Sequence, residues 1–269
     1  MYRAMESERP DALFHDPYAR RLAGTQGDEM LRHVPRARQY AGPMIVRTAA
    51  IDELIQELIE REGIDLIVNL AAGLDARPYR MQLPPNLQWV EADYPQMIDE
   101  KSRRLAGETP RCKLERIGVD LADRAARRAL LQRIGTMGTK GLVISEGLLV
   151  YLSSDQVAEL AQDLAAQPIF QFWITDIASP LVLKMMKRAW SRQFDADTTT
   201  FRFAPKEGAA FLAPYGWKLE RYRSVFLDLG RYHREPSMMW IWRVFFPRWA
   251  RQEVDRHSGP MTGTLLLSR

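Results

Sequence analysis

The sequence IDLIVNLAAGLDARPYR, residues 64–80, decides the fold of this protein. Its first seven residues form an apolar, β-branched run, which is typical of a strand buried in a parallel sheet. Ala71, Ala72 and Gly73 follow it, and such small residues let a ligand approach the backbone. A short helical piece at 77–81 comes next, and a helix N-terminus offers amide donors to a ligand. The segment predicts a strand, a tight turn and a helix, whether or not the turn binds anything.

The chain repeats this alternation of strand and helix on both sides of the turn. Before it, a helix carries an apolar stripe at helical spacing and ends at Gly63. After it, the predicted strands are 87–92, 113–117, 141–145, 169–175 and 262–268, and the predicted helices are 94–106, 121–134 and 153–166, the last begun by a capping-box pattern of Ser153 and Gln156. Such alternation is typical of an α/β doubly wound sheet, which binds its ligand at the carboxyl ends of the strands.

Length and composition indicate one globular domain over residues 1–269. Apolar residues make up 46% and charged residues 27% of the chain, near the average of folded proteins. The single cysteine, Cys112, allows neither an internal disulfide nor a cysteine-rich zinc site, and we expect no metal. No apolar run approaches the roughly 18 residues of a membrane span, and the first ten residues lack a signal-peptide pattern. We expect a cytoplasmic protein without a membrane partner.

The net charge of +4 is concentrated near the C-terminus. Residues 218–256 contain nine basic and five acidic residues, so this stretch accounts for the whole excess. A basic surface attracts acidic substrates or nucleic acid. However, no Lys/Arg run there exceeds two residues, which favours an ordinary surface whose arginines cover apolar neighbours. We expect no nucleic-acid partner.

The turn itself argues against a dinucleotide. A dinucleotide fingerprint needs three glycines, and only Gly73 is present here. Asp75 also lies on the turn, where its carboxylate repels a pyrophosphate but can hold an amino-acid head group. These residues favour S-adenosylmethionine, which has a methionine tail in place of phosphates, over NAD.

Acidic residues follow the next three predicted strands. Asp93 lies 20 residues past the turn, where a carboxylate can accept both hydroxyls of a ribose, or can cap a helix. Asp120 can accept from an adenine amino group while Leu121 packs on the ring, and a helix cap is the alternative. Glu146 ends an apolar strand, so it needs a cation, either a ligand ammonium or a local arginine. Together these positions indicate one site.

These motifs resemble those of the leucine carboxyl methyltransferase family, which uses S-adenosylmethionine. Within it, the chain is most similar to the bacterial branch of tetracenomycin-type polyketide O-methyltransferases. The matching segments run in order over about 80% of the chain: residues 3–7 and 10–17, Arg47-Thr48, 74–80, 91–95 with Lys101, 146–152, Phe211-Leu212 and Gly216-Trp217. The resemblance implies a class I methyltransferase fold with a Rossmann-like seven-stranded sheet and an N-terminal helical lid.

The resemblance also implies a role for each matched residue. Arg47 would hold the methionine carboxylate and Glu146 would lie near the methionine amino group. The turn at 71–73 would pass under that moiety, with Asp75 included in the site. Asp93 would hold the ribose, with Tyr94 beside it, and Asp120 and Leu121 would contact adenine. The family usually has Leu-Gly-Ala-Gly where this chain has Leu70-Ala71-Ala72-Gly73, so Ala71 adds a methyl group near the ligand.

The methyl acceptor is less well defined by the sequence. A carboxylate is ionised at neutral pH, whereas a phenol, with a pKa of about 10, benefits from a general base. None of the four histidines directly follows a predicted parallel strand, which favours a carboxylate. His233 or His15 could still fold over the site, and His233 is the candidate base. Tyr151 is a candidate for orienting the acceptor, with packing at the strand end as its alternative.

Two segments are expected to lie over the site. They are residues 1–40 and an insertion at 179–205. The aromatic and methionine residues of the insertion suit a bulky aromatic or polyketide-like acceptor, with packing in the core as their alternative. The sequence therefore predicts O-methylation of a carboxylate or hydroxyl of a small molecule. Alternatives are carboxyl methylation of a protein C-terminus, an NAD-binding domain, and a non-catalytic Rossmann-like module, which Ala71 favours.

Overall fold

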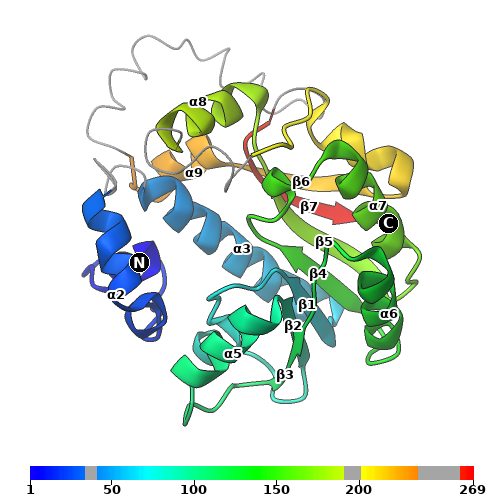
Figure 1. The fold of residues 1–269 in the computed structure, drawn as a ribbon, viewed down its shortest axis with the longest axis horizontal. Helices are drawn as coiled ribbons and strands as arrows, with labels where there is room; N and C mark the ends of the chain where they lie inside the picture. Colours follow the sequence, from blue (N-terminus) through cyan, green and yellow to red (C-terminus); the bar gives the residue numbers. More distant parts are fainter. Residues whose placement is uncertain (34–40, 191–200, 236–260) are drawn as a thin grey trace.

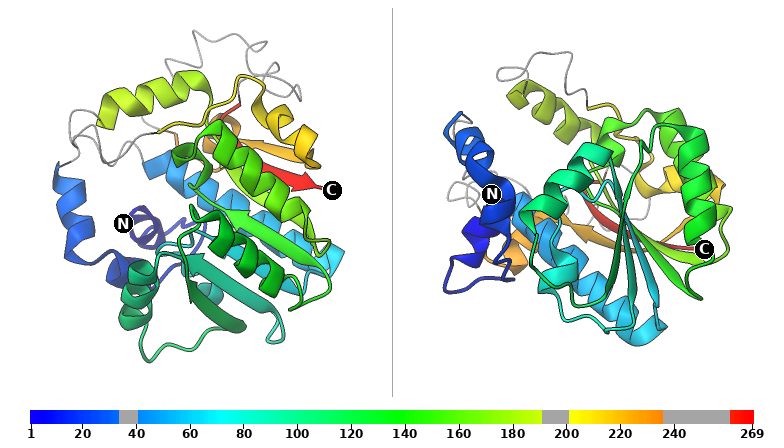
Figure 2. Two further views of the ribbon diagram at one scale, coloured as in Figure 1. Left: turned by 45° about the vertical axis from the view of Figure 1, so that its right-hand side comes forward. Right: turned by 60° about the horizontal axis from the view of Figure 1, so that its bottom comes forward.

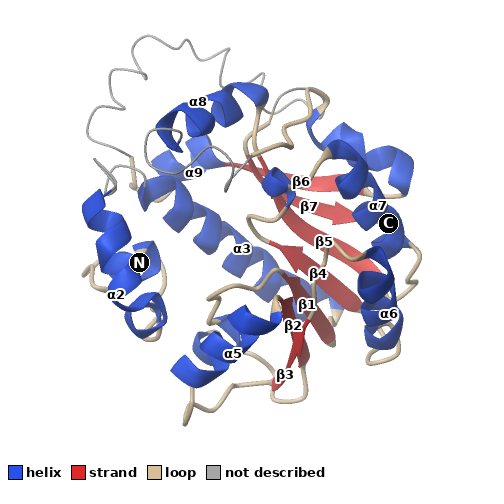
Figure 3. Cartoon of the chain, in the orientation of Figure 1, coloured by secondary structure: helices blue, strands red, loops and turns tan. Residues whose placement is uncertain are grey.

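The computed structural model describes residues 1–33, 41–190, 201–235 and 261–269, and these build one seven-stranded sheet (Figures 1 and 3). Its strands are β1 (Leu66–Leu70), β2 (Gln88–Asp93), β3 (Lys113–Gly118), β4 (Gly141–Ser145), β5 (Phe170–Ile177), β6 (Lys218–Ser224) and β7 (Gly263–Ser268). They lie in the order β3-β2-β1-β4-β5-β7-β6. The first five strands are parallel, and β7 is antiparallel to both β5 and β6. The predicted α/β sheet is therefore confirmed.

Helices cover both faces of the sheet (Figure 2). The side chains of its strands alternate between these two faces. Leu66, Val68 and Leu70 of β1 belong to the core formed with α6 (Arg124–Ile134) and α7 (Ser154–Ala165). Ile67 belongs to the opposite core, which contains the apolar stripe of α3 (Ala41–Glu62). Because successive side chains of a strand point to opposite faces, this one strand anchors both layers.

Most helices begin and end where the sequence predicts. α4 (Arg77–Arg80) and α5 (Pro95–Arg104) follow β1 and β2, and α6 ends at Gly135. At the start of α7 the Ser153 hydroxyl accepts from the backbone N–H of Gln156, and the Gln156 side chain accepts from the backbone N–H of Ser153. This confirms the capping box.

The strand β6 has no counterpart among the predicted strands. It is an edge strand, KLERYRS, and most of its side chains are exposed or half-buried, so it lacks an apolar alternation. Arg221 and Arg223 instead reach α3, where they pair with Glu57 and Glu53. Because the residues of this strand have no hydrophobic period, the sequence pattern cannot reveal it. Charged residues on an edge strand also hinder its pairing with other chains.

The N-terminal helices are α1 (Tyr2–Ser7) and α2 (Ala19–His33, broken at Gly24). An arginine of α1 connects this region to the turn after β1. Arg3 pairs with Asp16 and donates to the carbonyl of Leu74, in the turn after β1. Residues 34–40 of the expected N-terminal lid lie outside the described residues.

The remaining elements follow β4, connect β5 to β6, or follow β6. They are η2 (Leu149–Tyr151), α8 (Pro180–Trp190), η3 (Gly208–Tyr215) and α9 (Val225–Arg231). Residues 191–200 of the expected 179–205 insertion lie outside the described residues, as do residues 236–256 of the basic stretch. No helix in the described part of the chain is long and apolar enough to cross a bilayer.

Candidate active site

Asp93 links the ends of two neighbouring strands. It ends β2, beside β1, and its carboxylate accepts from the backbone N–H of Gly73 at 2.6 Å and from that of Tyr94 at 2.7 Å. The residue is 8% exposed. Asp93 does not cap the following helix, because Tyr94 is the N-cap of α5 and no side chain caps it. The carboxylate instead fixes the turn after β1, and Asp93 also lines a pocket at this edge of the sheet.

Ala71 has a backbone conformation that favours glycine. Its φ is 53°, in the left-handed region, where an L side chain costs about 1 kcal/mol or more. Gly73 in the same turn has a φ of 46°. The backbone N–H of Ala72 donates to Ala92 at 3.3 Å, which ties the turn to β2 as well. The turn thus keeps a glycine-like path even though an alanine occupies its first position.

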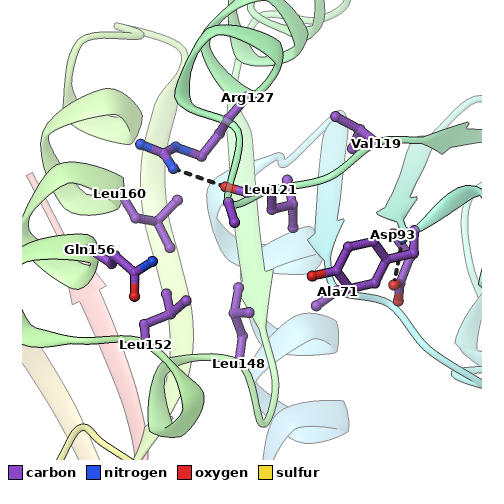
Figure 4. Close-up of a pocket in the computed structure, with 11 residues that line it drawn as sticks. Ala71, Asp93, Val119, Leu121, Arg127, Leu148, Leu152, Gln156 and Leu160 are labelled. Carbon is purple, nitrogen blue, oxygen red and sulfur yellow. Dashed lines mark hydrogen bonds between the residues drawn. The ribbon is translucent and has the colours of Figure 1, made fainter.

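A pocket opens at the carboxyl ends of β1, β2 and β3 (Figure 4). One wall comes from the segment after β3, the opposite wall comes from η2 and α7, and the turn and the end of β2 complete it. The lining residues are Ala71, Asp93, Tyr94, Val119, Leu121, Ala122, Arg127, Leu148, Leu152, Gln156 and Leu160. Four predicted cofactor residues, Ala71, Asp93, Tyr94 and Leu121, therefore line one pocket.

The wall after β3 is held by an arginine of α6. Arg127 donates to the carbonyl of Leu121 at 2.9 Å (Figure 4) and pairs with Asp163 of α7 at 2.6 Å. Asp120, also predicted to contact the cofactor, is exposed and accepts from the backbone N–H of Ala122 at 2.9 Å. It does not cap α6, because Asp123 does so.

A network of ion pairs lies at the ends of β1, β4 and β5. Arg47 of α3 donates to Glu146 at 3.0 Å and to Asp176 at 3.1 Å, and Asp176 also accepts from the backbone N–H of Gly147. Burial disfavours the Arg47 cation, but the charges of Asp176 and Glu146 outweigh it and raise its pKa. Arg47 and Glu146, each predicted for the methionine end of the cofactor, are therefore in direct contact with each other.

Arg77 joins this network to the turn. Its guanidinium, only 2% exposed, lies 2.6 Å from Asp52, 2.7 Å from Asp75 and 2.9 Å from Glu146. Burial opposes ionisation of Asp75, yet Arg77 and more distant cations hold its pKa well below the usual range. The pKa of Glu146 is lowered by Arg77 and Arg47 against the same effect of burial. Local arginines thus supply the cation that Glu146 needs. This is the second of the two alternatives that the sequence left open for this residue.

The two residues proposed for the acceptor lie in different surroundings. Tyr151 ends η2, is 45% exposed and packs against Phe201 with ring centroids 5.4 Å apart. Burial raises the pKa of its phenol, with a smaller lowering contribution from Arg47. His233 is exposed after α9, and no described hydrogen bond or ring contact joins it to another candidate residue.

Several residues of the site were not predicted. Asp176 is a carboxylate near the end of β5. It directly follows the predicted strand 169–175, as Asp93 follows 87–92, so the same strand-end rule could have found it. Arg77 lies in the matched segment 74–80, but the resemblance assigns it no role. Asp52 lies in a helix whose sequence was interpreted only through its apolar stripe. No group of three or more His, Cys, Asp or Glu residues suited to a metal occurs within the described ranges.

Comparison with known proteins identifies the family. The model of the leucine carboxyl methyltransferase family matches residues 1–165. A Streptomyces avermitilis protein named as an S-adenosyl-L-methionine-dependent methyltransferase is 29% identical over 82% of this chain and 81% of its own. A Streptomyces coelicolor protein with the same description is 30% identical over 80% of this chain and 79% of its own.

Two solved structures share the fold at low sequence identity. A DUF574 family protein from Streptomyces avermitilis superposes with a TM-score of 0.60 at 12% identity, covering 100% of this chain and 95% of that one. The magnesium protoporphyrin IX methyltransferase of Synechocystis PCC 6803, solved with S-adenosylhomocysteine, gives 0.50 at 12% identity, covering 93% and 98%. The class I methyltransferase fold is therefore confirmed, and the chain belongs to the leucine carboxyl methyltransferase family.

Proposed function

We propose that this protein transfers a methyl group from S-adenosylmethionine to a carboxylate or hydroxyl oxygen of a small, hydrophobic or aromatic acceptor. S-adenosylmethionine is the cofactor in the names of the sequence relatives. When bound, it supplies an electrophilic methyl group, and positioning of the acceptor provides most of the acceleration. We also propose that the protein belongs to the branch of the family that methylates polyketides.

The arrangement around Asp93 is the observation that carries the cofactor site. The order β3-β2-β1-β4 puts the turn after β1 between Asp93 on one side and Glu146 on the other. The mostly apolar pocket beyond Asp93 suits a flat base, and Asp93 keeps acceptor capacity for ribose hydroxyls. We therefore place the adenosyl group in the pocket and the methionine end beside Arg47.

The charge balance of the network fits that methionine end. Its four guanidiniums, of Arg3, Arg47, Arg77 and Arg80, contact five carboxylates, of Asp16, Asp52, Asp75, Glu146 and Asp176. This leaves one negative charge in excess. S-adenosylmethionine carries an ammonium and a sulfonium against one carboxylate, so its net charge is complementary. We propose that Asp120, although exposed, accepts a hydrogen bond from the adenine amino group.

Tyr151 supports an aromatic acceptor. Its ring packs on Phe201, and α8 adds exposed Leu181 and Met185 in the expected 179–205 insertion. We propose that this insertion and residues 1–40 cover the acceptor, within one domain of residues 1–269. We assign the acceptor side to Tyr151, because its environment includes Arg47 and Asp176, and keep His233 as the candidate base for a hydroxyl acceptor.

Ligand-dependent thermal unfolding tests the cofactor site. A ligand that binds only the folded state at a hundredfold excess over its Kd adds about 2.7 kcal/mol to the free energy of unfolding. S-adenosylmethionine and S-adenosylhomocysteine should each raise the melting temperature, NAD should not, and Asp93→Ala should abolish the effect. Absence of any shift in the natural protein contradicts the proposed cofactor site.

Transfer of a labelled methyl group then tests the acceptor. Aromatic carboxylic acids, phenols and peptides with a free C-terminus are offered separately. Methyl esters release methanol in alkali, whereas methyl ethers are stable, so the product distinguishes carboxylate from hydroxyl. Labelling of peptides alone supports the protein C-terminus as acceptor and overturns the small-molecule proposal.

A further inference from the structure

We infer that Gln156 recognises the base of the cofactor, by donating a hydrogen bond from its side-chain amide nitrogen to a ring nitrogen of adenine. The inference rests on the proposed position of the adenosyl group in the pocket. Gln156 lies in the first turn of α7 and lines the pocket opposite the segment after β3. Figure 4 shows its amide beside Leu152 and Leu160, with the nitrogen on the side of Leu148 and Leu121.

The capping box fixes which end of the amide reaches the pocket. The backbone N–H of Ser153 donates to Oε1 of Gln156 at 2.9 Å. Only the oxygen of an amide accepts a hydrogen bond, so the orientation of this side chain follows from its partner. Nε2 must then point away from the helix N-terminus, and it makes no hydrogen bond to the described residues. The capping box thus leaves both N–H groups of Nε2 of Gln156 available to the pocket.

The other N–H donor side chain of the lining is already committed. Arg127 uses its guanidinium on Asp163 and on the carbonyl of Leu121. Around Gln156 the lining is apolar, formed by Leu148, Leu152 and Leu160, and such walls make an unpaired polar group costly. Adenine presents three ring nitrogens that only accept, so a fixed N–H donor between apolar walls matches its edge.

A substitution that keeps the cap but removes the donor separates recognition from folding. Glutamate at the third position of a helix forms the same capping box, and its charge favours the helix N-terminus. Gln156→Glu should therefore leave the melting temperature without ligand unchanged. Its affinity for S-adenosylhomocysteine, measured by titration calorimetry, should fall about tenfold or more, because a carboxylate oxygen then faces a ring nitrogen.

Ser153→Ala is the matched control. It removes the hydroxyl that caps α7 but keeps the backbone N–H that orients the Gln156 amide. The melting temperature should fall, while the affinity for S-adenosylhomocysteine at low temperature should change less than about threefold. A Gln156→Glu protein that binds S-adenosylhomocysteine as tightly as the natural protein overturns the inference.

Ligand analogues identify the nitrogen concerned. The 1-deaza, 3-deaza and 7-deaza forms of S-adenosylhomocysteine each lack one ring acceptor. One of them should bind the natural protein more weakly than the parent, and that difference should vanish in Gln156→Glu. If no analogue shows this coupling while Asp93→Ala still abolishes binding, the cofactor site stands and the role of Gln156 is refuted. No binding to the natural protein refutes both.

Discussion

The two halves of the sheet's carboxyl edge are built differently. On the side of β2 and β3, the pocket is lined by mostly apolar side chains, and its wall after β3 is held from behind by Arg127 and Asp163. On the side of β4 and β5, Arg47, Arg77 and their carboxylates form ion pairs with one another before any ligand arrives. The apolar side chains of the first half line an open pocket, whereas the charged side chains of the second half are already paired with one another.

This difference teaches how each half contributes to stability and to binding. A ligand in the pocket covers apolar surface without breaking protein contacts, so changes there should affect affinity more than folding. In the charged network a ligand group competes with existing ion pairs, and removal of one member leaves buried charge uncompensated. Changes in the network should therefore affect folding first.

Arg77→Met should have the largest effect on stability. The guanidinium is almost fully buried between Asp52, Asp75 and Glu146, and its loss leaves these carboxylates without their shared cation. Breaking a buried pair in this way costs about 3–5 kcal/mol. Urea denaturation at neutral pH measures the change in the free energy of unfolding.

Arg61→Met is the control for that substitution. Arg61 is 73% exposed and pairs with Glu57 one helical turn away. Such surface pairs contribute about 0.5 kcal/mol or less. Equal losses in the two variants contradict a special role of the network.

Acidification should weaken the same network. The folded-state pKa values of Asp75 and Glu146 lie below their usual values, so their ionisation stabilises the fold above pH about 4–5 and this contribution disappears as the pH falls. Each unit of pKa difference corresponds to about 1.4 kcal/mol.

Comparison with Asp75→Asn isolates the contribution of Asp75. The free energy of unfolding of the natural protein should fall more steeply between pH 5 and pH 3 than that of the variant. Parallel curves exclude Asp75 as a source of the acid sensitivity.

Ala71→Gly should have the smallest effect, and it sharpens the comparison from the pocket side. Glycine relieves the left-handed strain at φ 53°, and the free energy of unfolding should rise by about 1 kcal/mol or less. Because Ala71 lines the pocket, the affinity for S-adenosylhomocysteine should not fall.

Ala72→Gly is the matched control in the same turn. Ala72 is buried and is not among the residues with positive φ in the described chain. Glycine there gives freedom to the unfolded state and removes a packed methyl group, so stability should fall. A loss of stability in both variants argues that strain at Ala71 is not significant.

The sequence predicted the central strands, most helices and the pocket side of the site. Asp93 and Leu121 could be expected beside the same pocket because parallel strands end at one edge of a sheet, a rule that needs only strand positions. The capping box of Ser153 and Gln156 was found because its two residues lie three apart. The strand β6 was not found, because its exposed, charged residues carry no hydrophobic period.

Tertiary structure alone decided what each charged side chain does. The sequence determined that a buried Glu146 needs a cation, but Arg47 and Arg77, which supply it, lie 99 and 69 residues earlier. Asp176 meets Arg47 across 129 residues. Local periodicity and turn chemistry act over a few residues and therefore fix the elements. Ion pairs depend on which elements become neighbours, and only the folded chain sets those distances.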